Sequence, residues 1–135
     1  MKILYKSDFY QISYDEKHQL MHYYHPAATF DMTPAQYQEE LQAIIKYSLE
    51  YKPKLGLGDL RDFQFIITPD MQEWMDEQLQ PVNQAINFQK HAVLLPSEFI
   101  VQLSVKQAVE INLDTNAKTR YFADEQEARE WLFAS

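Results

Sequence analysis

Short strand-like segments alternate with longer helix-like segments along most of this chain, and this order constrains the fold more than any other feature. Apolar and polar residues alternate over Phe9–Tyr14, as in a strand with one buried face, and His18–Tyr24 returns after a polar turn. Residues 3–6 form either a further strand or an extension of the first. Later strand-like segments occupy Lys54–Leu60, His91–Leu95 and Thr119–Ala123. We therefore expect an α/β fold with a single-layer mixed β-sheet, antiparallel strands first and parallel strands after.

About four α-helices are expected to pack on this sheet. Thr33 and Thr68 each precede a proline, and a threonine cap followed by proline at the first helical position is a typical helix start. Gln36 completes a capping box with Thr33. Pro81 interrupts the second helix, where we expect a kink. The expected helices run from Thr33 to before Pro53, over residues 68–89, over residues 97–113 and from Asp124 onward.

The composition places the chain among soluble globular proteins. Its 135 residues are 46% hydrophobic and fit one domain, residues 1–135. Because the sequence has no cysteine, disulfides, thiolate metal sites and cysteine nucleophiles are excluded. The formal charge of −8 disfavours nucleic acid and anionic membranes as partners. We expect no membrane insertion and a cytoplasmic location, since the sequence lacks a long apolar run and the pattern of a signal peptide.

Three segments, Gly58–Pro69, Thr68–Trp74 and Arg120–Leu132, are similar to segments of a known domain family. The first lies where STAS domains carry Asp-Leu-Ser, a short apolar loop and a helix start. The other two resemble a bacterial STAS-like branch, often called SpoIIAA-like and grouped with Sec14-type lipid-binding domains. The resemblance spans nearly the whole chain and implies a STAS-like fold. It specifies fold better than function.

The chain departs from this family at the position of the regulatory phosphate. In the anti-sigma-factor antagonists, the phosphorylated serine follows an aspartate and precedes a glycine at a helix start. Here Ile67 replaces the aspartate and Pro69 takes the place of the serine, so only Thr68 retains a hydroxyl. Thr68 is therefore the phosphorylation candidate. A helix-capping role alone is the commoner reason for a threonine in this position.

Polar residues gather where strands are expected to end. Asp59, Arg61 and Asp62 end one strand, Thr68 opens a helix, and Ser97 follows the next strand. In open α/β sheets, ligands bind beyond the carboxyl ends of the strands, and a helix N-terminus favours anions. We expect these residues to share one rim and to bind a ligand or partner. The alternative is that Asp59 and Arg61 form only a partly exposed ion pair.

The connection between that strand and the next helix is unusually apolar, with Phe63 and Phe65 in it. It plugs the core, extends the strand, or forms an exposed patch that meets a partner. An alternative is that these residues, with Tyr23, Tyr24 and Phe30, line a pocket for a lipid-like or aromatic ligand.

Neither a metal site nor a catalytic site is expected. His18 and His22 would share one strand face about 13 Å apart, which is too far for two ligands of one zinc ion. The carboxylates of Glu39–Glu40, and of Glu125 with Glu127, are expected on solvated helix faces. No nucleotide-binding, hydrolase or metalloprotease motif occurs. The chain is therefore predicted to be non-enzymatic and to need no cofactor.

The leading hypothesis is a STAS-like regulatory or protein-interaction module that docks a protein partner near residues 59–69. The alternative is a carrier of a small apolar or anionic, lipid-like ligand, as the Sec14 grouping implies. Homodimerisation through an edge strand or an apolar helix face is compatible with either hypothesis.

Overall fold

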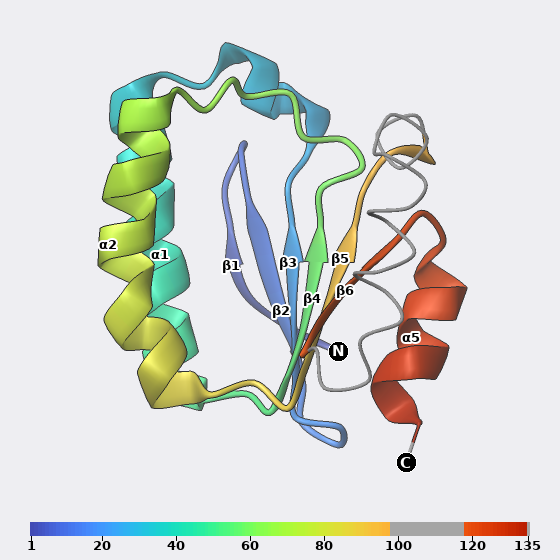
Figure 1. Cartoon of the computed structure of the whole chain (residues 1–135). Helices are drawn as coiled ribbons and strands as arrows, with labels where there is room; N and C mark the ends of the chain where they lie inside the picture. The colour runs from blue at the N-terminus through green and yellow to red at the C-terminus, as the bar shows by residue number, and fades with distance from the viewer. Residues whose placement is uncertain (98–117, 135) are drawn as a thin grey trace.

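The structure is a computed structural model that describes residues 1–97 and 118–134 (Figure 1). Its six strands form one sheet in the order β1-β2-β3-β4-β5-β6. The strands β1 to β3 pair antiparallel, and β3 to β6 pair parallel. The strand bounds are β1 Lys2–Lys6, β2 Gln11–Asp15, β3 Leu20–Tyr24, β4 Leu55–Asp59, β5 Lys90–Leu94 and β6 Thr119–Phe122. The predicted mixed sheet is confirmed, and residues 3–6 belong to a separate strand.

Helices cover both faces of the sheet. The helices α1 (Pro34–Tyr51) and α2 (Pro69–Ile86) lie on one side, and α5 (Glu125–Phe133) lies on the other (Figure 1). A short 3-10 helix, η1 (Ala27–Asp31), connects β3 to α1. Three of the four expected α-helices are thus present in the described residues. The fourth, expected over residues 97–113, falls almost entirely outside them.

The predicted start signals act as expected. The Thr33 side chain accepts a hydrogen bond from the Gln36 backbone N–H, and the Gln36 side chain accepts one from the Thr33 backbone, which completes the capping box. Thr68 likewise caps α2 by accepting from the backbone N–H of Met71. Pro81 lies inside α2, which continues through it as one helix. The kink there stays a prediction.

Two expectations about polar residues on these elements are wrong. His18 does not share a strand face with His22, because it lies in the turn before β3 and pairs with Asp15 there. Glu40 is not solvated, because its carboxylate accepts hydrogen bonds from the side chains of Tyr5 and Ser7, and the residue is buried. The turn thus holds His18 through Asp15, and the N-terminal segment that carries Tyr5 and Ser7 covers Glu40. Periodicity along the sequence does not report either contact.

Each face of the sheet has its own apolar core, since successive side chains of a strand point to opposite faces. Leu20, Leu55 and Leu57 pack with Ala128 and Leu132 of α5. On the other face, the buried core consists of Tyr10, Ile12, Met21 and Tyr23, against which Ile44, Tyr47 and Tyr51 of α1 pack. Ala128 and Leu132 are almost completely buried there.

Gly56 makes room for two aromatic rings on the α1 and α2 face of the sheet. The rings of Phe88 and His91 stack with centroids 5.3 Å apart. A Cβ atom on Gly56 would lie 2.9 Å from His91 Cδ2 and 2.9 Å from Phe88 Cζ, closer than ordinary packing. On Gly58, the nearest atom would be His91 Nε2 at an ordinary 3.8 Å.

We predict that Gly56→Ala lowers the free energy of unfolding by about 1–3 kcal/mol, because the added methyl group overpacks this face. Gly58→Ala is the matched control and should change stability by less than about 1 kcal/mol. Urea denaturation of both variants measures the difference. Equal stabilities would show that the stacked rings do not depend on Gly56.

Candidate functional site

A cluster of polar side chains lies at the carboxyl end of β4, on the face of the sheet that α5 covers. His22 projects from β3 to the same face as Leu20, and Asp59 projects from the end of β4 to the same face as Leu57. Glu125 lies in the first turn of α5. One ring nitrogen of His22 and one carboxylate oxygen from each acid lie within 4.8 Å of one another.

Asp59 is a buried carboxylate held by a residue two positions along the chain. Arg61 donates from its backbone N–H and from Nε to Asp59 Oδ1 at 3.1 and 3.0 Å, and from Nη2 to Oδ2 at 2.8 Å. Burial by itself raises the pKa of Asp59, but the hydrogen bonds and positive charge of Arg61 outweigh burial and hold the pKa below its ordinary value. Asp59 is 3% exposed and therefore depends on this bidentate partner.

Glu125 joins the strand end to the helix. Arg61 Nη2 lies 3.3 Å from Glu125 Oε1, and Arg129 Nε lies 3.2 Å from Glu125 Oε2. The second pair spans one helical turn, at the i,i+4 spacing that places side chains side by side. Arg61 and Arg129 thus balance the charges of Asp59 and Glu125.

His22 is the member of the cluster whose hydrogen bonding is incomplete. Its Nε2 atom is buried and has no hydrogen-bond partner among the residues described. Burial lowers the pKa of His22 below its ordinary value, so the ring is neutral at neutral pH. An unsatisfied buried polar atom costs about 1–3 kcal/mol, which calls for a physical explanation.

Asp62 forms a second contact at this end of the sheet. Its Oδ2 accepts a hydrogen bond of 2.6 Å from the hydroxyl of Tyr24. That bond, together with burial and the negative charge of Asp62, raises the pKa of Tyr24 to about 12. Three predicted site residues, Asp59, Arg61 and Asp62, therefore lie near one another, as the sequence suggested.

The remaining predicted residues lie elsewhere. Thr68 caps α2, on the face of the sheet opposite to α5, whereas the Asp59 side chain lies on the α5 face (Figure 1). The expectation that Thr68 and Asp59 share one rim is therefore wrong, because the sheet separates them. Phosphorylation of Thr68 stays a prediction, and its cap already explains the residue. Ser97 is exposed after β5, beside residues outside the described part of the chain.

Phe63 and Phe65 plug the core on the α1 side, which is one of the three roles expected for this connection. The ring of Phe63 contacts His25 edge-on, with centroids 5.1 Å apart, and Phe65 stacks on Tyr37 of α1 at 5.1 Å. Both residues are half-buried. Burial lowers the pKa of His25 to about 3, so this ring remains neutral.

The cavity beside Phe63 is too small for a lipid-like ligand. It encloses about 20 Å³ between Phe63, His25 and residues of α1. That is room for about one water molecule, whereas ligand pockets measure several hundred Å³. The pocket expected between Tyr23, Tyr24, Phe30, Phe63 and Phe65 is not formed, because Tyr23 and Tyr24 point to opposite faces of the sheet and Phe30 is 72% exposed. Carriage of a ligand stays a prediction without support from this cavity.

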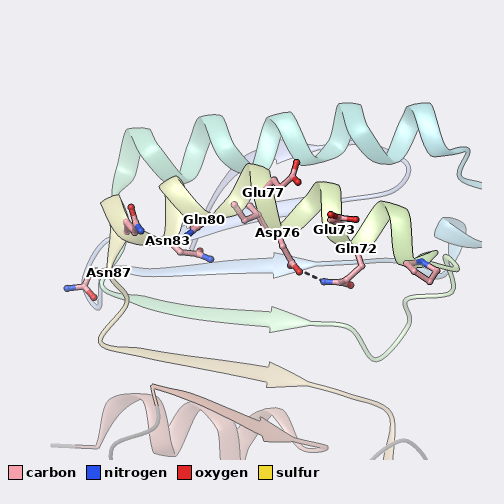
Figure 2. Close-up of a pocket in the computed structure, with 10 residues that line it drawn as sticks. Gln72, Glu73, Asp76, Glu77, Gln80, Asn83 and Asn87 are labelled. Carbon is pink, nitrogen blue, oxygen red and sulfur yellow. Dashed lines mark hydrogen bonds between the residues drawn. The ribbon is translucent and has the colours of Figure 1, made fainter.

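An open hollow of about 890 Å³ runs along the polar side of α2 (Figure 2). Acidic and amide side chains line it, and Gln72 donates a hydrogen bond of 3.0 Å to Asp76. Such side chains, spaced three and four residues apart, are typical of a solvated helix face.

Sequence reasoning missed His22, Glu125 and Arg129 as members of the polar cluster. Spacing along the chain compares His22 only with other histidines, and the expected solvated face of Glu125 hides its proximity to His22 and Asp59. The available signal was the alternation of β3, which places His22 opposite to the apolar Met21 and Tyr23. That Glu125 meets this face depends on how α5 packs, which no local pattern encodes.

Comparisons with models of protein families, with curated proteins and with solved structures found no match to this chain. None of the helices in residues 1–97 and 118–134 combines the length and apolar character needed to cross a membrane.

We predict that Asp59→Asn lowers the free energy of unfolding by about 2 kcal/mol at pH 7, because it removes charge-assisted hydrogen bonds from a buried group. The folded-state pKa of Asp59 lies below its unfolded value of about 3.9, so its carboxylate stabilises the fold above that pH. This stabilisation is lost as the pH falls through the folded value. Chemical denaturation between pH 7 and pH 2 should show the difference from wild type shrinking below about pH 4.

Asp31→Asn, at an exposed position, is the control and should change stability by no more than about 0.5 kcal/mol. A difference between Asp59→Asn and wild type that stays constant from pH 7 to pH 2 would contradict the assigned role of the Asp59 charge.

Phe63→Ala should destabilise the fold by about 2 kcal/mol, because the ring fills space against His25 and Phe65. Ile66→Ala, three residues away at a position that is 83% exposed, should change stability by no more than about 0.5 kcal/mol. Thermal unfolding followed by circular dichroism compares the two. Similar costs for both would mean that this connection does not plug the core.

Proposed function

We propose that this chain is a non-enzymatic, STAS-like regulatory module that docks a protein partner at the end of the domain formed by η1 and the connection 60–68. The proposal rests on two large apolar side chains exposed there, Phe30 at 72% and Ile66 at 83%. Isolated exposed apolar residues are common, but two of them on hydrogen-bonded segments favour an interface at this end of the domain.

The two segments are held to one another. The backbone N–H of Gln64 donates a hydrogen bond of 2.9 Å to the side chain of Thr29, which is fully buried. Thr29 in turn donates to the carbonyl of Pro26 at 2.8 Å. Both segments therefore present their apolar side chains from a fixed backbone, which lowers the entropy lost on binding. We call Phe30 and Ile66 the apolar tip.

The charge around the apolar tip favours one class of partner. Asp31 follows Phe30, Asp62 lies in the same connection as Ile66, and Asp70 lies in the first turn of α2; all three are exposed. With a net charge of −8, the chain attracts a segment that combines apolar and basic side chains. Complementary charge of this kind mainly raises the association rate and selects the partner.

Self-association through the outer strand β1 is disfavoured. The outer strand β1 has lysines at both ends, Lys2 and Lys6, and both are exposed. Antiparallel self-pairing centred on Leu4 would set Lys2 of one copy opposite Lys6 of the other, which places like charges together. Lysine on an edge strand is a known protection against such pairing.

Selection from a displayed random peptide library tests the proposal with the purified full chain. We expect the selected peptides to combine apolar with Lys or Arg side chains, and their affinity to fall as salt increases. Ile66→Ser and Phe30→Ser should each weaken binding at least about tenfold, as removal of an interface anchor does. The control is Leu49→Ser, at a position on α1 that is 39% exposed and away from the apolar tip.

If no peptide is selected, or if the selected peptides bind Ile66→Ser as tightly as wild type, the apolar tip is not a docking surface. Selection of peptides that carry mainly acidic side chains would contradict the charge argument.

A further inference from the structure

The polar cluster beneath the N-terminus of α5 contains the atoms of a metal-binding site. His22 contributes an imidazole, and Asp59 and Glu125 contribute carboxylates, with one potential ligand atom from each within 4.8 Å of the others. Ligands at about 2.1 Å from a cation lie about 3–4 Å apart, so these groups need to move by about 1 Å to share one ion. The three residues come from β3, β4 and α5, so the rigid sheet and one helix fix their spacing.

The histidine provides a second observation, independent of the acids. Its Nε2 is buried and has no hydrogen-bond partner in the part of the chain described, although buried imidazole nitrogens are ordinarily paired. The charges of Asp59, Glu125, Arg61 and Arg129 all act on the His22 ring. A cation that His22 binds through Nε2 would satisfy this nitrogen.

We propose that His22, Asp59 and Glu125 bind one first-row divalent cation such as Zn²⁺ or Mn²⁺. One imidazole with two carboxylates suits such ions, because imidazole favours the transition metals and zinc while carboxylates also accept manganese. Two carboxylates balance the charge of one divalent ion once Arg61 and Arg129, which pair with them in the structure, turn away. Magnesium fits less well, because it prefers oxygen ligands and retains its water.

Arg61 competes with the cation. Its guanidinium occupies both oxygens of Asp59 and approaches one oxygen of Glu125. A carboxylate oxygen has a second lone pair, so the ion and the guanidinium can share Asp59, but their like charges repel and weaken binding. The Arg61 side chain is 38% exposed and can turn towards solvent when the ion binds. The affinity for metal is therefore set partly by this residue.

Isothermal titration calorimetry of the full chain with ZnCl₂ and with MnCl₂ tests the site. We expect one ion per chain, binding about tenfold tighter to Arg61→Gln than to wild type, because the competing charge is gone. His22→Gln and Glu125→Gln should each bind about tenfold more weakly or worse, since each removes a ligand. Mn²⁺ should also broaden the NMR signals of the His22 ring before those of the other histidines.

His18→Gln is the matched control. His18 also pairs with a carboxylate, Asp15, at 2.7 Å, but it lies on the surface in a turn, so its removal should leave the affinity unchanged. Glu125→Gln keeps the size of a side chain that is 37% exposed, and it tests the site if His22→Gln fails to fold.

The proposal is overturned if wild type and Arg61→Gln both bind Zn²⁺ and Mn²⁺ no more tightly than about 1 mM. It is equally overturned if Glu125→Gln binds as tightly as wild type, or if His18→Gln alone loses binding. None of these outcomes depends on whether the apolar tip docks a partner.

Discussion

The parallel pairing of β3 with β4 is the interaction on which the rest of the structure depends. Its register sets Leu20 opposite Leu55 and His22 opposite Leu57. Because side chains alternate between faces, this register sends one set of residues towards α5 and the next towards α1. A shift by a single residue would exchange the two sets and expose both cores. The register of β3 with β4 therefore determines the two apolar clusters and the polar cluster together.

The same register buries the carboxylate of Asp59, and Arg61 neutralises its charge from two residues further along the chain. Asp59 ends β4 where its side chain is covered by α5, and a buried carboxylate without a partner would destabilise the fold strongly. Arg61 lies only two residues further on, so little chain entropy is lost when it closes on Asp59. Glu125 and Arg129 extend this pair onto the helix, which ties α5 to the strand end. Asp59 and Glu125 therefore both attach α5 to the sheet and form part of the proposed metal site.

The connection after β4 divides its apolar residues between two roles. Phe63 and Phe65 turn inward against His25 and Tyr37, while Ile66 turns outward. The inward rings fix the path of the connection, and the outward side chain extends from that fixed backbone. The segment η1, which carries Phe30, lies beyond the carboxyl end of β3 (Figure 1), and the polar cluster lies at the same end of the sheet, on the face that α5 covers.

The sequence by itself determined the element order, the mixed sheet and the helix starts, because alternation, threonine caps and prolines act within a few residues. It also indicated Asp59 with Arg61, which are neighbours along the chain. Only the tertiary structure decided that Glu125 meets His22, that Glu40 is buried beneath β1, and that Thr68 and Asp59 lie on different faces. These outcomes depend on which face each helix covers, and side-chain packing between distant segments settles that choice.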